Sequence, residues 1–319
     1  MSDFSALAVP HPPGSSKRFV IALRCGRLAN RLVLFANFIA LAEEQGHRVV
    51  NFTFHSYADL FDSTRRDIYC QYPEAVRRSW LDMIPGVADG IRKTRIFYHA
   101  TRATCRASEN FPLFGKSAVT LREISGQKVT SLTSPEVTAQ IREARTVFVY
   151  GWNFRAPELV LRHAQIIRDY FRPLEIHTQV SREAVARLRR DADIVVGVHI
   201  RHGDYQQWRD GQCYFPVERY AAWMRELAEQ FPGRKVAFLV CSNEPRNQSE
   251  FQELTIGFGP GYSIADLYAL AECDYVMGPL GTFSQWASFY GNKPLFHLRG
   301  ADARVELSRF QVSDLGEVP

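Results

Sequence analysis

The feature that most constrains the fold is the regular alternation of strand-like and helix-like segments over the last third of the sequence. Short aliphatic runs, each as long as a buried strand, are separated by longer amphipathic stretches. The expected strands are 194–200, 235–241, 274–277 and 294–298, and the expected helices are 217–230, 264–271 and 283–290. Strands that alternate with helices form a parallel sheet covered by helices, because parallel neighbours need a crossover connection.

The start of the chain shows the same pattern. A strand at 19–23, a tight loop, a helix at 28–45 that ends at Gly46 and a strand at 49–54 make one parallel unit with a right-handed crossover. A further strand is expected at 146–151, and helices at 158–170 and 176–190. The segment 56–143 has no clear period. We therefore expect an α/β fold with a flexible lead-in at 1–18, an N-terminal domain at 19–172 and a C-terminal domain at 173–319.

The bulk composition narrows the class of protein. The chain has 319 residues, 46% hydrophobic and 23% charged, with a net charge of +5 that is too mild and too evenly spread to indicate nucleic-acid binding. No apolar run approaches the roughly 18–20 residues of a membrane span. The six cysteines form no C-x-x-C pair, and the start is rich in proline and serine and does not resemble a signal peptide. We expect a cytoplasmic protein with reduced thiols and no transmembrane segment.

The first candidate site follows the expected strand 194–200. The run His199-Ile-Arg-His-Gly-Asp-Tyr205 places polar groups where an otherwise aliphatic strand ends, and ligands of open α/β sheets bind just beyond such ends. Arg201 at a rigid strand end suits a diphosphate, since its fork donates two charge-assisted hydrogen bonds. The alternative is a purely structural ion pair between Arg201 and Asp204.

Two further candidates lie downstream. Asp266 opens a helix, where it either complements the helix dipole or accepts hydrogen bonds from a base or a ribose. The run Gly278-Pro-Leu-Gly-Thr-Phe-Ser-Gln285 follows a strand and opens a helix, so its N–H groups and the hydroxyls of Thr282 and Ser284 suit an anion or, alternatively, form a plain N-cap. There is no D-x-D pair and no His/Cys ligand spacing. We expect no metal and no cofactor, with Arg201 supplying the positive charge.

These residues resemble a known family. His199-Ile-Arg-His-Gly-Asp-Tyr205 resembles the H-x-R-x-G-D-Y signature of the α-1,2-fucosyltransferases, within the wider group that includes α-1,6- and protein O-fucosyltransferases. Three more segments agree in the expected order. They are Cys25-Gly-Arg-Leu-Ala-Asn-Arg31, similar to G-x-L/F-G-N-Q, Val240-Cys-Ser-Asn-Glu-Pro245, similar to F-S-D/N-D-P, and Gly281-Thr-Phe-Ser-Gln-Trp286, similar to S-x-F-S-W-W.

The resemblance implies a GT-B-like pair of Rossmann-type domains, with an acceptor-side N-terminal domain and a C-terminal domain that binds the nucleotide sugar. It implies inverting, metal-independent transfer of fucose from GDP-fucose to a glycan or lipid-linked sugar. Arg201 would bind the β-phosphate, Asn30 would lie near the reacting centre, and Asp204 is a candidate general base. The other implied donor-site residues are His199, Gly203, Asp266, Thr282, Phe283 and Ser284, and the acceptor-side loop contains Gly26, Arg27 and Arg31.

The chain also departs from the family pattern, with Ala29 in place of a glycine, Arg31 in place of a glutamine, Gln285 in place of a tryptophan and Gly278-Pro-Leu-Gly before Thr282. These changes leave the acceptor and the linkage open. The expected setting is a bacterial surface glycan assembled in the cytoplasm or at the inner face of the membrane. The alternatives are a transferase for another nucleotide sugar, a relative without catalysis, and a histidine phosphatase, whose R-H-G signature matches 201–203.

Overall fold

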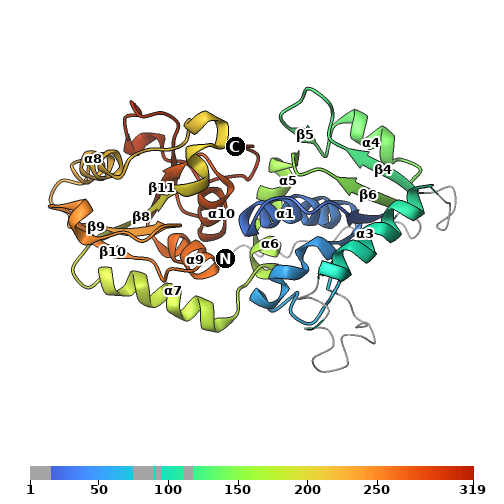
Figure 1. Ribbon diagram of the computed structural model, residues 1–319, viewed down its shortest axis with the longest axis horizontal. Helices are drawn as coiled ribbons and strands as arrows, with labels where there is room; N and C mark the ends of the chain where they lie inside the picture. The colour runs from blue at the N-terminus through green and yellow to red at the C-terminus, as the bar shows by residue number, and fades with distance from the viewer. Residues whose placement is uncertain (1–15, 75–89, 91–94, 111–117) are drawn as a thin grey trace, which may run out of the picture. The chain divides into compact units, whose positions relative to one another are not determined.

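The computed structural model describes residues 16–74, 90, 95–110 and 118–319 (Figure 1). The chain divides into two compact units. Unit 1 contains Met1–Arg24, Phe35–Ala58 and Ser63–Ile167, and unit 2 contains Cys25–Leu34, Asp59–Asp62 and Arg168–Pro319. Most of the expected lead-in, 1–15, lies outside the described residues. The sequence-based boundary between 172 and 173 lies five residues from the passage between Ile167 and Arg168.

Unit 2 contains an all-parallel five-stranded sheet in the order β10-β9-β8-β11-β12. Its strands are β8 (Ile194–Ile200), β9 (Val236–Ser242), β10 (Thr255–Phe258), β11 (Tyr275–Pro279) and β12 (Leu295–Leu298). Strand order reverses between β8 and β11, because β9 and β10 follow β8 on one side and β11 and β12 on the other. Such a switch point is where open α/β sheets bind ligands at their carboxyl edge.

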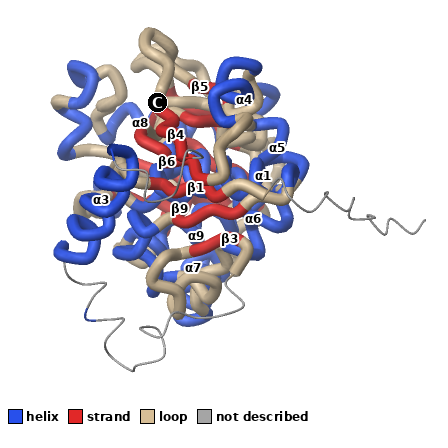
Figure 2. The backbone as a smooth tube through the Cα atoms, turned by 90° about the vertical axis from the view of Figure 1, so that its right-hand side faces the viewer, coloured by secondary structure: helices blue, strands red, loops and turns tan. Residues whose placement is uncertain are grey.

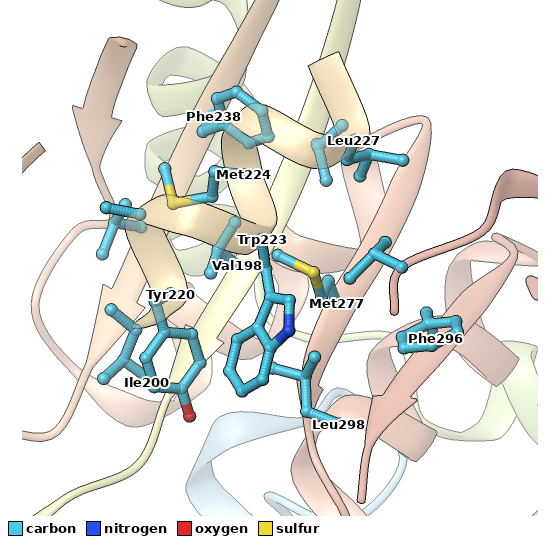
Figure 3. Close-up of a cluster of buried hydrophobic side chains, with 14 of the residues drawn as sticks. Val198, Ile200, Tyr220, Trp223, Met224, Leu227, Phe238, Met277, Phe296 and Leu298 are labelled. Carbon is cyan, nitrogen blue, oxygen red and sulfur yellow. The ribbon is translucent and has the colours of Figure 1, made fainter. Parts of the chain in front are cut away.

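Helices cover both faces of this sheet. They are α7 (Glu175–Leu188), α8 (Val217–Ala228), α9 (Ser263–Glu272) and α10 (Thr282–Gly291). Alternate residues of β8, including Val198 and Ile200, pack against Tyr220 and Trp223 of α8 (Figure 3). Gly197 points to the other face, where a Cβ would lie 2.7 Å from Leu270 of α9. This is the burial on both faces that a run of aliphatic residues predicts, and Figure 1 shows α8 opposite α7 and α9.

Unit 1 contains a second five-stranded sheet, in the order β3-β2-β1-β6-β4. Its strands are β1 (Arg18–Ile21), β2 (Arg48–Val50), β3 (Gln71–Tyr72), β4 (Ala118–Arg122) and β6 (Thr146–Tyr150). All neighbours are parallel except β2 and β3. Figure 2 shows β1, β6 and β4 side by side. The small strands β5 (Thr130–Ser131) and β7 (Phe154–Arg155) pair separately.

The helices of unit 1 begin with α1 (Leu28–Gln45), whose first residues belong to unit 2. The others are α3 (Arg95–Asn110), α4 (Pro135–Ile141), α5 (Pro157–Arg162) and, passing into unit 2, α6 (Ala164–Tyr170). Two sheets with mainly parallel strands and covering helices confirm the expected α/β fold with Rossmann-type parallel sheets.

Three local expectations are corrected. The strand expected at 49–54 ends at Val50, and Phe52–Leu60 is a 3₁₀ helix. At the break, Asn51 accepts a hydrogen bond from the Thr53 hydroxyl and its carbonyl accepts from the Phe54 N–H, so the backbone turns. The helix expected at 158–170 is two helices separated at His163. Strand β10 was not expected, because Gly257 interrupts its short apolar run where Leu188 packs closely.

Candidate functional site

The predicted residues of the last third gather at the carboxyl edge of the unit 2 sheet. His199 lies near the end of β8, Arg201 follows it, and the segment Gly278–Gly281 runs from the end of β11 into α10. These two strands flank the switch point. The backbone of Gly278 passes so close to β8 that a Cβ would lie 3.0 Å from the Cβ of His199. The sheet itself therefore brings together two segments about eighty residues apart.

His199 is buried and forms part of the inner wall of the site. Its ring stacks on Phe283 at 4.7 Å between centroids, and its Nδ1 lies 3.1 Å from the Ser284 hydroxyl. Burial, reinforced by the nearby charges of Arg201 and His297, lowers the pKa of His199 to about 3. The imidazole is therefore neutral at physiological pH. It suits a hydrogen-bonding role, not a role as a cation or an acid.

Arg201 follows the last residue of β8, and most of its side chain is buried. Its Nη2 donates to Asp204 at 2.8 Å, and its guanidinium lies 5.5 Å from the Tyr205 ring centroid. Asp204 is also paired with Arg27 at 3.5 Å. The structural pair that the sequence left open is thus present. Arg201 and Arg27 thus both pair with the half-exposed Asp204 carboxylate. A diphosphate could take the place of this carboxylate as the partner of the two cations.

The turn that follows Arg201 is held by Asn243, which comes directly after β9 and was not among the predicted site residues. Asn243 accepts from the His202 N–H at 2.8 Å and donates to its carbonyl at 3.2 Å. Gly203 has a φ of +62°, and a Cβ there would lie 3.1 Å from the Asn243 amide. The segment Val240–Pro245 was noted only for its resemblance. In the structure this segment supplies Asn243, whose two hydrogen bonds to His202 hold the turn after β8.

The ring of His202 is fully engaged. Its Nε2–H donates to the Phe215 carbonyl at 2.7 Å, and its Nδ1 accepts from Arg246 at 2.6 Å. Arg246 is itself nearly buried and paired with Glu244 and Glu250. No lone pair of His202 remains to attack phosphorus, which argues against the histidine-phosphatase alternative. Arg246 lies just past the noted motif, and no pattern in the sequence marks it.

Asp266 lies in the first turn of α9, next to Cys241 of β9 and to Gly259, which follows β10. It is 7% exposed and accepts from the Gly261 N–H at 2.9 Å. Gly259 leaves room for it, since a Cβ there would lie 2.5 Å from its Oδ1. Burial raises the pKa of Asp266 to about 6, and the Gly261 hydrogen bond opposes that rise. A buried carboxylate with spare lone pairs suits the paired N–H donors of a nucleobase.

The start of α10 meets the first turn of α1, whose residues up to Leu34 cluster with unit 2. The Thr282 hydroxyl donates to the Asn30 side-chain oxygen. Gly26 has a φ of +56°, and a Cβ there would lie 1.9 Å from the Asn30 amide nitrogen. Arg31 is buried and donates to the Gly26 carbonyl, so it holds the loop and does not project from it. Arg27 of the loop and Asn30 of α1 reach the donor-site segments, at Asp204 and Thr282.

The described residues also lack a metal-binding cluster and a membrane-spanning helix. In the parts of the chain that the structure describes, His, Cys, Asp and Glu form no group of three or more that could hold a metal ion. Among the helices described, none has both the length and the apolar character needed to cross a membrane.

Comparisons with known proteins agree with the motifs. Residues 139–295, about half of the chain, match the model of glycosyl transferase family 11. Galactoside alpha-(1,2)-fucosyltransferase 1 of Saimiri sciureus is 31% identical over 156 residues, 44% of this chain and 40% of that protein. Nodulation protein Z of Azorhizobium caulinodans is 27% identical over 153 residues, 38% of this chain and 47% of that protein. The matched region thus spans less than half the length of these curated relatives.

The fold has solved counterparts as well. One is the structure of a mutant of Arabidopsis thaliana FUT1 in complex with GDP. The superposition includes 93% of this chain and 73% of the FUT1 chain, with a TM-score of 0.56 and 15% sequence identity. At this identity the similarity concerns the fold. The chain therefore has a GT-B-like fold, and its residues 139–295 match the model of glycosyl transferase family 11, which confirms the family resemblance that its motifs predicted.

Proposed function

We propose that this protein transfers fucose from GDP-fucose to a hydroxyl of a glycan or lipid-linked sugar, without a metal ion and with inversion at the anomeric carbon. The observation that carries the proposal is the position of Arg201. It follows β8 at the switch point of the unit 2 sheet, beside the start of α10. The match to family 11 and the fucosyltransferase relatives agree with it.

In the proposed reaction the acceptor oxygen bonds to the anomeric carbon while the bond from that carbon to the β-phosphate oxygen breaks, and GDP leaves with the electron pair. Negative charge grows on the diphosphate. Arg201, together with the backbone N–H groups at the start of α10, stabilises that charge more in the transition state than in the ground state. The hydroxyls of Thr282 and Ser284 are engaged with Asn30 and His199. Phe283 and Gly203 shape the wall, and His199 supplies a neutral hydrogen bond.

The acceptor hydroxyl must lose a proton, and Asp204 is the proposed base. In the structure this carboxylate is paired with Arg201 and Arg27. Binding of the diphosphate to Arg201 would free the carboxylate for the acceptor. His199 is unsuitable as the base because its pKa of about 3 makes it a weak proton acceptor. Asn30, held by Thr282, orients the acceptor.

Asp266 is the proposed guanosine contact, because its buried carboxylate can accept from two adjacent N–H donors of guanine. Uracil and adenine present a different donor pattern on their edges. The same residue therefore sets the preference for GDP over UDP or ADP. A transferase for another nucleotide sugar remains the second candidate function, favoured by the changed segment Gly278–Gly281 at the donor rim.

Calorimetric titration with GDP, GDP-fucose, UDP and ADP in the presence of EDTA tests the proposal. We expect micromolar binding of GDP that is lost in Arg201→Ala and weakened in Arg201→Lys, since lysine cannot form the two-pronged contact. Asp204→Asn should keep GDP affinity and lose turnover. Binding of UDP or ADP in place of GDP would change the donor, and absence of any nucleotide binding would refute the proposed function.

A further inference from the structure

The sheet of unit 1 has its own switch point, and one built turn lies at its carboxyl edge. Strand order reverses between β1 and β6, since β2 lies beyond β1 and β4 lies beyond β6. The turn Gly151–Arg155 follows β6 directly. By the rule that applies to unit 2, this edge is where a ligand of unit 1 would bind. The donor-site motifs described above use no residue of this turn.

The turn is held in place by a carboxylate from the neighbouring strand. Glu123, which follows β4, accepts from the N–H groups of Trp152 and Asn153 and, at 3.4 Å, from the Asn153 side chain. Gly151 allows this approach, because its φ is +150° and a Cβ would lie 2.5 Å from the Glu123 side chain. Three hydrogen bonds to one carboxylate fix where the side chains of 152 and 153 point.

Trp152 is half-buried and is supported by a buried cation. Arg155, 1% exposed, donates through Nη1 to the carbonyls of Trp152 at 2.6 Å and Phe154 at 2.9 Å. Its guanidinium carbon lies 5.4 Å from the Trp152 ring centroid. This arrangement costs free energy, since burial lowers the pKa of Arg155 to about 10 against the attraction of Glu123. The cation holds the indole ring in one orientation, and Trp152 as a residue is partly exposed.

Hydrogen-bond donors and an acceptor at this turn have no hydrogen-bond partner among the described residues. The side-chain oxygen of Asn153 and the Nε and Nη2 of Arg155 are buried and have no hydrogen-bond partner within the described part of the chain. A hydroxyl group both donates and accepts, so it can satisfy an acceptor and a donor that lie in one turn, whereas an anion can only accept. The pairing of an indole face with such atoms is the chemistry that recognises a neutral sugar ring.

We propose that Trp152 and Asn153 form the subsite for the acceptor glycan, with a neutral pyranose stacked on the Trp152 indole and one of its hydroxyls bonded to Asn153. Glu123 and Arg155 are positioning residues that hold this pair. The inference rests on the proposed function for the meaning of the subsite, but sugar binding at Trp152 can be measured without any turnover.

The test is saturation-transfer NMR on the full chain with excess GDP and four methyl glycosides, of β-galactose, β-glucose, N-acetyl-β-glucosamine and α-mannose. We expect at least one to receive saturation from the wild type. Trp152→Ala should reduce that transfer about fivefold or more, and Trp152→Phe should retain most of it, since a benzene ring keeps an aromatic face. Asn153→Ala should weaken binding of the same glycoside.

Tyr57→Ala, which removes a half-buried ring elsewhere in unit 1, is the matched control and should bind sugar as the wild type does. The melting temperature and GDP affinity of each variant report whether it folds. In turnover, Trp152→Ala should raise the KM for acceptor and leave hydrolysis of GDP-fucose by water unchanged.

The inference is overturned if no glycoside binds the wild type, if Trp152→Ala binds as well as wild type, or if the variant alters donor hydrolysis as much as transfer. If the wild type does not bind GDP, the proposed function is overturned instead. Intact GDP binding without sugar binding would refute only the subsite.

Discussion

Replacement of Asp266 by asparagine should stabilise the protein while weakening its affinity for GDP. The carboxyl is 7% exposed, and burial raises its pKa from 3.8 to about 6. A difference of roughly two pKa units corresponds to about 3 kcal/mol of folding free energy that the ionised group loses. An asparagine carries no charge to desolvate, and its side-chain oxygen can still accept from the Gly261 N–H. The gain at pH 7.5 should therefore approach that magnitude.

The sign of the pH dependence follows from linkage. Between pH 3.8 and 6 the folded chain holds a proton on Asp266 that the unfolded chain has released, so wild-type stability falls as pH rises through this window and stays reduced above it. Asp266→Asn lacks this loss. Its melting temperature should exceed that of the wild type by several degrees at pH 7.5 and by little at pH 4.

Asp274→Asn is a control of opposite sign within the same unit. Burial disfavours the Asp274 carboxylate, but its bonds to Arg189 at 2.8 Å and to the Val195 N–H at 2.9 Å lower its pKa below the usual value. Its amide variant should be less stable at pH 7.5. The melting temperature is measured by calorimetry and GDP affinity by titration. A lower melting temperature of Asp266→Asn at pH 7.5, or an equal increase at pH 4 and 7.5, would refute the reasoning.

Further substitutions at three positions test the reasoning about the site and its surroundings. Asn243→Ala leaves the His202 N–H without its partner, so we expect the free energy of unfolding to fall by about 1–3 kcal/mol. In a double-mutant cycle, Arg201→Ala should reduce GDP affinity less in the Asn243→Ala background than in the wild type. Gly26→Ala should lower both turnover and melting temperature, because a φ of +56° strains alanine by about 1–2 kcal/mol and its Cβ displaces Asn30; unchanged turnover would contradict the role of Asn30. Gln285→Met should raise the melting temperature, since this fully buried amide has no hydrogen-bond partner among the described residues and an apolar side chain removes a cost of about 1–3 kcal/mol. Gln285→Glu should do the opposite in the same thermal scan.

Much of unit 2 could be predicted from the sequence because its signals are local. The strand at 194–200 and the helix that starts at 217 occur where they were expected, since a run of aliphatic residues or a helical period needs only its own neighbourhood to be recognised. The polar residues at strand ends were visible for the same reason. Strand β10 was missed because its four residues, with Gly257 among them, carry almost no periodic signal. The described parts of the segment 56–143 combine short strands with helices, and the sequence of this segment shows no clear period from which they could be predicted.

The sequence by itself determined the alternation of strands and helices and the residue types that meet at the carboxyl edges. Only the tertiary structure decided which of them touch. Thr282 meets Asn30 across 252 positions of sequence, and Arg246 meets the ring of His202 across 44. The raised pKa of Asp266 depends on its burial within the folded unit. Contacts and desolvation of this kind depend on how distant segments pack, which local periodicity does not encode.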